Sequence, residues 1–208
     1  SGNLPIFVTK STCFMHRIAI FASGSGTNAE RIVTYFREHP SIEVALILSN
    51  KADAYVLERA RNLGIPVAVF DRQQFRDSDI VLNILKNNRI DFIVLAGFLW
   101  LVPNHLLNTF HGRILNIHPA LLPKYGGKGM YGMNVHEAVI ASGDTESGIT
   151  IHQVNERYDR GDIVFQARCP VLPGATPETL ANRVHLLEYE YYPIVIAQQL
   201  TVHRSPLT

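Results

Sequence analysis

The sequence is poor in cysteine, in long apolar runs and in net charge. Its 208 residues include two cysteines, Cys13 and Cys169, which are far apart and show no C-x-x-C spacing. We therefore expect two free thiols rather than a disulfide framework or a zinc site. No apolar run approaches the roughly 18 residues that a membrane span needs. With 19 basic and 18 acidic residues, the formal net charge of +1 gives no general attraction to nucleic acid or anionic membrane, so any anionic ligand must be held by a local device.

The first sixteen residues lack the pattern of a secretory signal, which combines a charged start, an apolar stretch and a small-residue cleavage site. We expect residues 1–16 to be a leader or tag that is disordered, and residues 17–208 to form one domain in a cytoplasmic protein. A hydrophobic fraction of 47% allows that domain a substantial core.

Short apolar runs alternate with helical segments through the first half of the chain. Such runs, bounded by glycine or proline, are typical of buried parallel strands. The expected strands cover residues 17–23, 42–49, 65–70, 91–96 and 112–117, and the expected helices cover 29–38, 54–63 and 79–88. This alternation predicts an α/β fold with a doubly wound, mostly parallel sheet, in which ligands bind beyond the carboxyl ends of the strands.

The second half of the chain has a different pattern. Residues 121–132 are rich in glycine and proline and predict a long loop, followed by a helix over 134–142. Residues 148–154 and 162–171 predict a hairpin that adds antiparallel strands to the sheet. A long final helix is expected over 176–200, and Pro193 is expected to kink or break it.

A glycine-rich turn joins the first expected strand to the first helix. It contains Gly24, Gly26, Thr27 and Asn28. Backbone N–H groups at such a turn converge on an anion, and the helix N-terminus adds partial positive charge. Ala29 and the absence of a third glycine exclude the dinucleotide pattern, and no Walker A lysine is present. A monophosphate site fits best; the alternative is a plain turn in which Thr27 or Asn28 caps the helix.

Asn116 and His118 close the fifth expected strand. Residues two apart in a strand point the same way, so both side chains should enter one pocket. An amide can stabilise a developing oxyanion and an imidazole can move protons, as acyl or formyl transfer requires. The alternative is a hydrogen-bonded histidine at a strand end.

Asp159 lies in a polar turn between the two hairpin strands. A carboxylate near His118 would raise the pKa of the imidazole and fix its tautomer. Turn formation alone also explains an aspartate at this position. We expect His152, on a hairpin strand, to be structural. Because no H-E-x-x-H or comparable spacing occurs, we predict no metal.

Together these residues resemble the folate-dependent formyltransferases. The similarity extends from about Arg17 to the end of the last helix, and it is most specific in the Asn-x-His-Pro-x-Leu-Leu-Pro run that starts at Asn116. The Gly-Ser-Gly-Thr-Asn turn favours the members that act on glycinamide ribonucleotide. Other matching stretches are 49–51, 94–98, 148–152 and 159–163.

The resemblance implies a Rossmann-like formyltransferase fold and a reaction in de novo purine synthesis. The substrate amine attacks the formyl group of 10-formyltetrahydrofolate, the co-substrate, and Asn116 and His118 stabilise a tetrahedral intermediate while Asp159 pairs with His118. Small molecules are the implied partners, with no nucleic acid or membrane, and the chain would be a monomer or homodimer. The implied ribonucleotide-binding residues are Gly26, Thr27, Asn28 and Glu188, and the implied folate-binding residues are Arg76, Leu99, Trp100, Leu101, Val102, Asn116, Asn155 and Asp159.

Some positions depart from the family pattern. Trp100 stands where an arginine is common, the loop over residues 126–133 is longer than usual, and the segment around Arg76, the candidate folate arginine, is compressed. The resemblance also implies a cis peptide between Leu122 and Pro123. A solvated helix charge is the alternative for Glu188. Formyltetrahydrofolate hydrolase, methionyl-tRNA formyltransferase and a non-catalytic nucleotide-binding module remain open as other functions.

Overall fold

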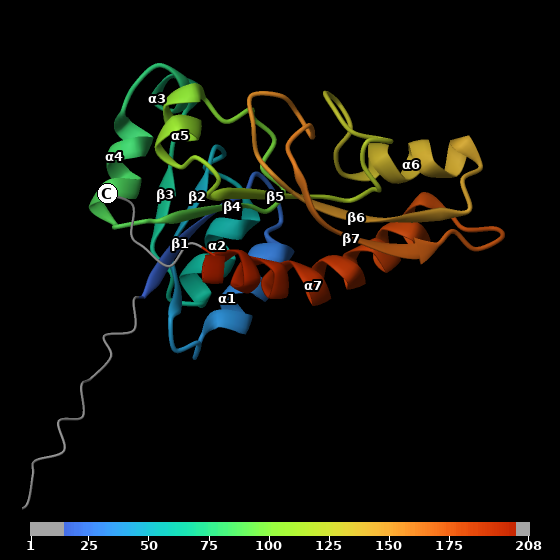
Figure 1. The fold of residues 1–208 in the computed structure, drawn as a ribbon, viewed down its shortest axis with the longest axis horizontal. Coiled ribbons are helices and arrows are strands. Elements are labelled where there is room, and N and C mark those ends of the chain that lie inside the picture. Colours follow the sequence, from blue (N-terminus) through green and yellow to red (C-terminus); the bar gives the residue numbers. More distant parts are fainter. Residues whose placement is uncertain (1–14, 203–208) are drawn as a thin grey trace, which may run out of the picture.

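A computed structural model describes residues 15–202 and shows one seven-stranded sheet in the order β3-β2-β1-β4-β5-β6-β7 (Figure 1). The strands are β1 (His16–Phe21), β2 (Ile42–Ser49), β3 (Val67–Val69), β4 (Phe92–Leu95), β5 (Ile114–His118), β6 (Glu146–Gln153) and β7 (Ile163–Pro170). The helices are α1 (Thr27–Phe36), α2 (Tyr55–Asn62), α3 (Arg72–Arg76), α4 (Ile80–Asn87), α5 (Asn104–Thr109), α6 (Met133–Ser142) and α7 (Pro177–Val202).

The direction of the strands confirms the predicted fold class. β1 to β5 are parallel, with β1 paired to both β2 and β4. At one end of the sheet, β6 is antiparallel to β5 and β7 is antiparallel to β6. The parallel strands all end at the same edge. The glycine-rich turn after β1 and the Asn116–His118 segment of β5 therefore share that edge, with the end of β4 between them.

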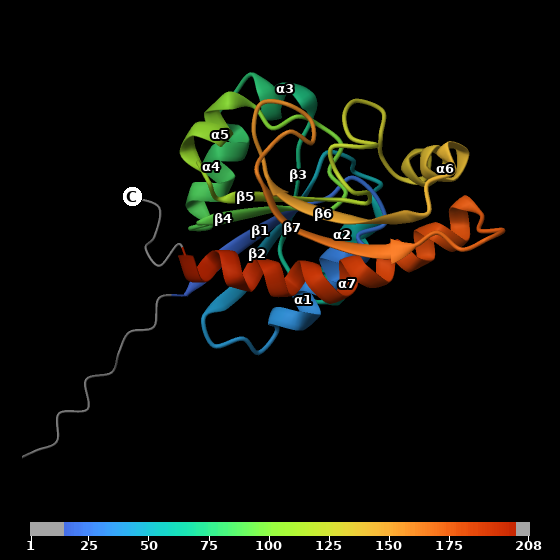
Figure 2. The ribbon, with the colours of Figure 1, turned by 45° about the vertical axis from the view of Figure 1, so that its right-hand side comes forward.

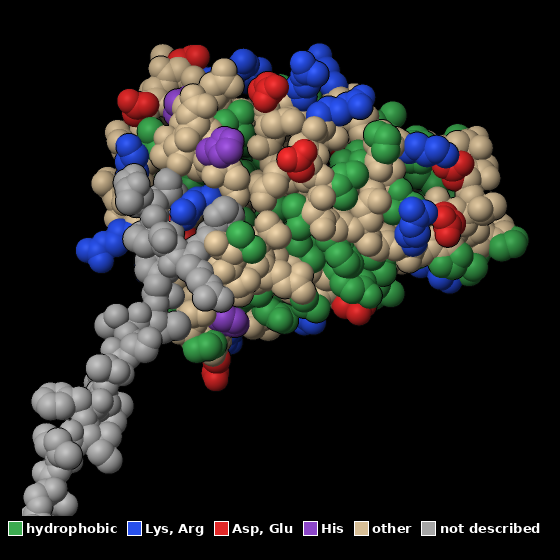
Figure 3. All heavy atoms as spheres, viewed as in Figure 1, with side chains coloured by type: hydrophobic (Ala, Val, Ile, Leu, Met, Phe, Trp, Pro, Cys, Tyr) green, Lys and Arg blue, Asp and Glu red, His purple; other side chains and the backbone are tan. Residues whose placement is uncertain are grey.

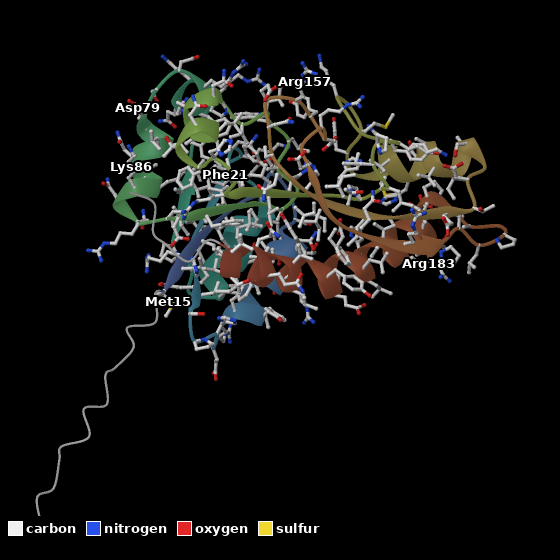
Figure 4. All side chains as sticks on the ribbon, in the orientation of Figure 1. Met15, Phe21, Asp79, Lys86, Arg157 and Arg183 are labelled. Atoms are coloured by element: carbon white, nitrogen blue, oxygen red, sulfur yellow. The ribbon has the colours of Figure 1, made fainter. Side chains whose placement is uncertain are left out.

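Alternating side chains of the strands build two cores, one on each face of the sheet. Ile18 and Ile20 of β1 belong to the core beneath α1, α2 and α7, while Ala19 and Phe21 belong to the core beneath α3, α4 and α5. Figure 2 shows these two helical layers on opposite sides of the sheet. In Figure 4, Phe21 lies inside the molecule, and Asp79 and Lys86 lie on its outer side at α4.

The observed elements differ from the expected ones in two additional short helices and by one or two residues at most strand ends. α3 and α5 were not predicted, because five and six residues carry too little periodicity. α3 does have a local signal: the side chain of Asp71 accepts from the Gln74 N–H and that of Gln74 accepts from the Asp71 N–H, which forms a capping box. His16, assigned to the leader, is a buried residue and begins β1.

Pro193 was expected to kink or break the final helix; it does not break it, since α7 continues from Pro177 to Val202. Proline has no N–H, so the carbonyl four residues earlier loses its helical donor. Here that carbonyl belongs to Tyr189, and the side chain of Arg31 on α1 donates to it through Nε at 3.3 Å. A tertiary hydrogen bond thus replaces the missing helical one, and Pro193 itself is buried in the packed face of α7.

Cys169 is a free and buried thiol, and burial raises its pKa. Cys13 and the expected leader over residues 1–14 lie outside the described residues. Within residues 15–202, no helix is long and apolar enough to cross a membrane. On the face shown in Figure 3, acidic and basic side chains are interspersed, which agrees with the formal net charge of +1.

Candidate active site

The last residues of β5 place two polar side chains at the carboxyl edge of the sheet. Asn116 is half-buried and His118 is 4% exposed, with Ile117 between them in the core of the opposite face. The strand alternation that predicted a shared pocket for Asn116 and His118 thus holds in the backbone of β5.

His118 uses one ring nitrogen for structure. Its Nε2 lies 2.7 Å from the backbone carbonyl oxygen of Tyr125, which can only accept, so Nε2 carries a hydrogen. Its Nδ1 lies 3.6 Å from Oδ2 of Asp159. Burial lowers the pKa of His118 by more than the carboxylate of Asp159 raises it. Because Nε2 is committed to the carbonyl of Tyr125, Nδ1 is the nitrogen open to a proton.

Asp159 comes from the loop between β6 and β7, where its φ of 53° lies in the left-handed region. Its Oδ2 accepts from the N–H of Gly127 at 2.9 Å, and its Oδ1 lies 3.6 Å from Nε2 of His152. Burial opposes ionisation, but neighbouring groups, among them His118 and the Gly127 N–H, hold the pKa of Asp159 below its usual value. Asp159 therefore does more than form a turn: its carboxylate lies 3.6 Å from one ring nitrogen of each of two histidines.

Two loops meet over these residues. In Figures 1 and 2 the β6–β7 loop and the glycine-rich segment before α6 rise on the same side of the sheet, and the bond from Gly127 to Asp159 joins them. Arg157, labelled in Figure 4, marks the exposed tip of the first loop. The second loop begins at the Leu122–Pro123 peptide, which is cis as predicted.

The turn after β1 leaves helix N–H groups open at the sheet edge. Gly26 is the N-cap of α1 with φ 75°, and no side chain caps the helix, so Thr27 and Asn28 do not act as caps. A Cβ on Gly26 would lie 2.3 Å from Cγ2 of Val56, which is closer than any side chain can approach. Glycine is required here by conformation and by space, and the free amides of the first turn suit an anion.

Glu188 links the turn to the rest of the site. It is 4% exposed, so the alternative of a solvated helix charge is wrong. Its Oε2 accepts from Nδ2 of Asn28 at 2.9 Å and pairs with Nδ1 of His185 at 2.8 Å. The hydrogen bond to Glu188 raises the pKa of His185 against the effect of burial. Sequence reasoning identified Asn28 and Glu188 but missed His185, whose i,i+3 spacing on α7 was the available signal.

The segment expected to line a folate pocket follows β4. Leu99 and Trp100 are half-buried and Leu101 is 39% exposed, whereas the side chain of Val102 is in the core. The hydroxyl of Tyr158, in the same loop as Asp159, lies 3.5 Å from the carbonyl oxygen of Leu99. The β6–β7 loop and this segment are therefore neighbours.

An unpredicted arginine approaches this segment. The guanidinium carbon of Arg72 lies 5.2 Å from the centroid of the Trp100 ring, within cation–π range. Arg76, the expected folate contact, is the exposed last residue of the same helix, α3. The side chain of Asn155 donates to the carbonyl of Arg160 and accepts from the N–H of Arg157, so it holds the shape of its loop.

Among residues 15–202, no group of three or more histidine, cysteine, aspartate or glutamate side chains is arranged to hold a metal ion. The chemistry that the described side chains can supply is proton transfer by His118, charge stabilisation by Asp159 and hydrogen bonding by Asn116.

The family of this chain follows from sequence comparison. The profile described as "Formyl transferase" matches residues 16–196. The chain belongs to the formyl transferase family. Among its relatives in the family, the phosphoribosylglycinamide formyltransferase of Haemophilus influenzae is 41% identical over 188 residues, which cover 88% of this chain and 86% of that protein. The chloroplastic phosphoribosylglycinamide formyltransferase of Arabidopsis thaliana is 44% identical over 86% of this chain, and the chain spans 64% of its length.

Solved structures of the family have the same fold. Glycinamide ribonucleotide transformylase 1 from Geobacillus kaustophilus superposes with a TM-score of 0.80 at 37% identity, covering 89% of this chain and 99% of that one. The phosphoribosylglycinamide formyltransferase of Bacillus halodurans gives a TM-score of 0.79 at 38% identity over 89% and 95% of the two chains. The sheet order and the long final helix are thus those of the formyl transferase family.

Proposed function

We propose that this chain is a phosphoribosylglycinamide formyltransferase, which transfers the formyl group of 10-formyltetrahydrofolate to the amine of glycinamide ribonucleotide in purine synthesis. One observation carries the proposal: a proton-transfer group, His118 with Asp159, shares a sheet edge with an open helix N-terminus, and the buried Glu188 links that helix to α7. A ribonucleotide amine has a phosphate, ribose hydroxyls and a nucleophilic nitrogen. The α1 N-terminus suits the phosphate, Glu188 suits the hydroxyls, and His118 can take the proton of the amine.

The ribonucleotide end of the site is built from α1 and α7. The N–H groups after Gly26, at Thr27 and Asn28, bind the phosphate, helped by the partial charge of the α1 N-terminus. Both hydrogen bonds that fix Glu188 use Oε2, which leaves Oε1 for the ribose hydroxyls. Gly26 supports the turn without a side chain in the way of the phosphate.

The transfer itself is carried by the β5 residues. The amine nitrogen attacks the formyl carbon, and Asn116 donates a hydrogen bond to the oxyanion that develops. His118 takes the amine proton on Nδ1, and Asp159 stabilises the imidazolium. The same proton then passes to the folate nitrogen as its bond to the formyl carbon breaks. The products are the formylated ribonucleotide and tetrahydrofolate, so atoms and charge balance without a metal.

The folate end of the site is assigned to the segment after β4 and the β6–β7 loop. The ring pocket is lined by Leu99, Trp100, Leu101 and Val102. Val102 contributes through its backbone, because its side chain is buried in the core. Asn155 and Asp159 shape the loop that closes it. The candidate arginine for the folate carboxylates is Arg76, and Arg72 over Trp100 is the competing one.

The deciding experiment offers two acceptors for the formyl group. Tetrahydrofolate release from 10-formyltetrahydrofolate is measured with glycinamide ribonucleotide and with water alone. We expect release only when the ribonucleotide is present, together with one formylated product per turnover. Equal release with water alone would identify a hydrolase instead. Binding of both ligands without release would identify a non-catalytic module. We further propose that the chain acts in the cytoplasm as a monomer or homodimer and binds no nucleic acid.

A further inference from the structure

His152 on β6 lies directly opposite Asn116 on the neighbouring strand β5. The two residues are register partners in the antiparallel pair of β5 and β6. His152 is 2% exposed, and its Nε2 lies 3.1 Å from Nδ2 of Asn116. Side chains of such a pair project to the same face of the sheet, so the imidazole packs beside the amide that we assign to the oxyanion.

The other ring nitrogen determines which tautomer His152 adopts. Its Nδ1 lies 2.8 Å from the backbone carbonyl oxygen of Gln153. A carbonyl oxygen only accepts, so the hydrogen of the neutral ring must be on Nδ1. Nε2 then carries the lone pair, and the hydrogen bond to Asn116 runs from the amide N–H to the imidazole.

This direction matters because the two ends of an asparagine amide have the same shape and opposite hydrogen-bonding roles. Turning the Asn116 amide by 180° would place Oδ1 against the lone pair of Nε2, which is repulsive. The observed orientation uses one N–H on His152 and leaves the second N–H for another acceptor. An amide turned the other way would present an oxygen, which repels an oxyanion.

We propose that His152 is a positioning residue for formyl transfer: its Nδ1–H tautomer, fixed by the carbonyl of Gln153, selects the orientation in which Asn116 presents an N–H to the formyl oxygen. The proposal rests on the proposed function for the role of Asn116. The tautomer and the amide orientation follow from the contacts of His152 alone.

Asp159 is the competing partner of His152. Its Oδ1 lies 3.6 Å from Nε2, which is longer than a hydrogen bond, whereas Asn116 is at 3.1 Å. If His152 acted through Asp159, Nε2 would carry a hydrogen and Asn116 would lose its acceptor. The two possibilities therefore differ in which nitrogen is protonated and in which residue transmits the effect.

A double-mutant cycle separates these possibilities. His152→Phe keeps a ring of similar size and removes the acceptor, and we expect a loss of about 10- to 100-fold in kcat with little change in KM for either substrate, below the ~10²–10³-fold loss for removing an oxyanion donor. In an Asn116→Ala background, His152→Phe should change kcat very little. An equal loss in both backgrounds would overturn the proposal, as would a loss that disappears in an Asp159→Asn background but persists with Asn116→Ala.

Two further measurements keep the test independent of folding and of the substrate assignment. His152→Gln can present an amide oxygen to Asn116 and should recover part of the kcat lost in His152→Phe. The ¹⁵N chemical shifts of the His152 ring in the wild-type protein should show hydrogen on Nδ1 and none on Nε2 near neutral pH. Hydrogen on Nε2 would refute the proposal even with full activity. A wild-type protein that shows the expected shifts but no transfer to glycinamide ribonucleotide would instead refute the proposed function.

Discussion

His118 has one ring nitrogen committed to structure and one available for chemistry. Nε2 is fixed on the carbonyl of Tyr125, while Nδ1 faces Asp159, and His118 itself is 4% exposed. The neighbouring carboxylate and the burial act on the pKa in opposite directions, and burial prevails. The sequence indicated the effect of Asp159 but not the depth at which the imidazole lies.

Replacing His118 with alanine removes the proton acceptor, and we expect a loss of about 10²–10⁴-fold in kcat. The measurement is formyl transfer to glycinamide ribonucleotide at saturating substrates. His111→Ala is the matched control because His111 is exposed in the turn before β5, at the opposite end of that strand from His118, and it should retain full activity. A His118→Ala enzyme with most of its turnover would show that the assigned mechanism is wrong.

Replacing Asp159 with asparagine removes the charge that raises the pKa of His118 and keeps an oxygen for the Gly127 N–H. Burial is then opposed only by the hydrogen bond to Tyr125 and the charge of Glu188, so the pKa of His118 falls further. Transfer requires the neutral ring, so the acid limb of the kcat profile should move to lower pH while kcat itself decreases. The profile is measured on both enzymes across that limb. An unchanged limb would separate Asp159 from His118.

At the scale of elements, the ends of strands and helices bring the site together. The α1 N-terminus, the end of β5 and the middle of α7 come from the beginning, middle and end of the chain, and Glu188 joins the first to the last through Asn28. Local sequence specified the glycine-rich turn and the Asn-x-His pair, because each lies within a few residues. The contacts of Glu188 depend on how α7 crosses the sheet, which no local pattern specifies.

Gly26→Ala should disable the proposed phosphate site, because a Cβ at Gly26 would overlap the side chain of Val56. We expect KM for the ribonucleotide to rise about tenfold or more, equivalent to ~1.4 kcal/mol of lost binding. Gly64→Ala is the matched control: it has a similar φ of 74° and no atom within 4 Å of the new Cβ. Both variants incur the left-handed strain of about 1–2 kcal/mol, so only Gly26→Ala should alter KM.

Tyr192 attaches α7 to the sheet. Its hydroxyl, on a fully buried ring, donates toward the carbonyls of Leu95 and Leu115 at 2.8 and 3.2 Å. Tyr192→Phe leaves these carbonyls without that donor and should lower the free energy of unfolding by about 1–3 kcal/mol in urea titrations. Tyr35→Phe is the control, since Tyr35 is 44% exposed and its variant should unfold at the wild-type midpoint. Equal stabilities would show that the hydroxyl contributes nothing to this attachment.

At the scale of the whole molecule, the titration of buried histidines links the site to stability. Burial is the main cause of the lowered pKa of both His118 and His136, and the charge of Glu188 partly opposes it. Each group binds its proton more readily in the unfolded chain, where the ordinary value is 6.5. His185 acts in the opposite sense, since Glu188 raises its pKa.

The free energy of unfolding should therefore decrease as pH falls below about 6.5, because His118 and His136 bind protons more readily in the unfolded chain than in the folded one. His136→Gln should reduce this decrease, as His136 titrates without a partner for its Nδ1. His111→Gln, at an exposed position, should leave the pH dependence unchanged. The measurement is the unfolding midpoint in urea as a function of pH. An identical dependence in His136→Gln and wild type would contradict the prediction.

The sequence by itself determined the strand-helix alternation, the glycine-rich turn and the pair Asn116 and His118, because each rests on residues close together in the chain. Only the tertiary structure decided that Asp159 and His152 lie beside that pair and that the buried Glu188 accepts a hydrogen bond from Asn28. It also decided that α7 remains a continuous helix at Pro193. These outcomes depend on pairing β5 with β6 and on packing α7 over α1, contacts between residues 36 to 160 positions apart. Such distant contacts are set by the burial of whole faces, which local periodicity cannot reveal.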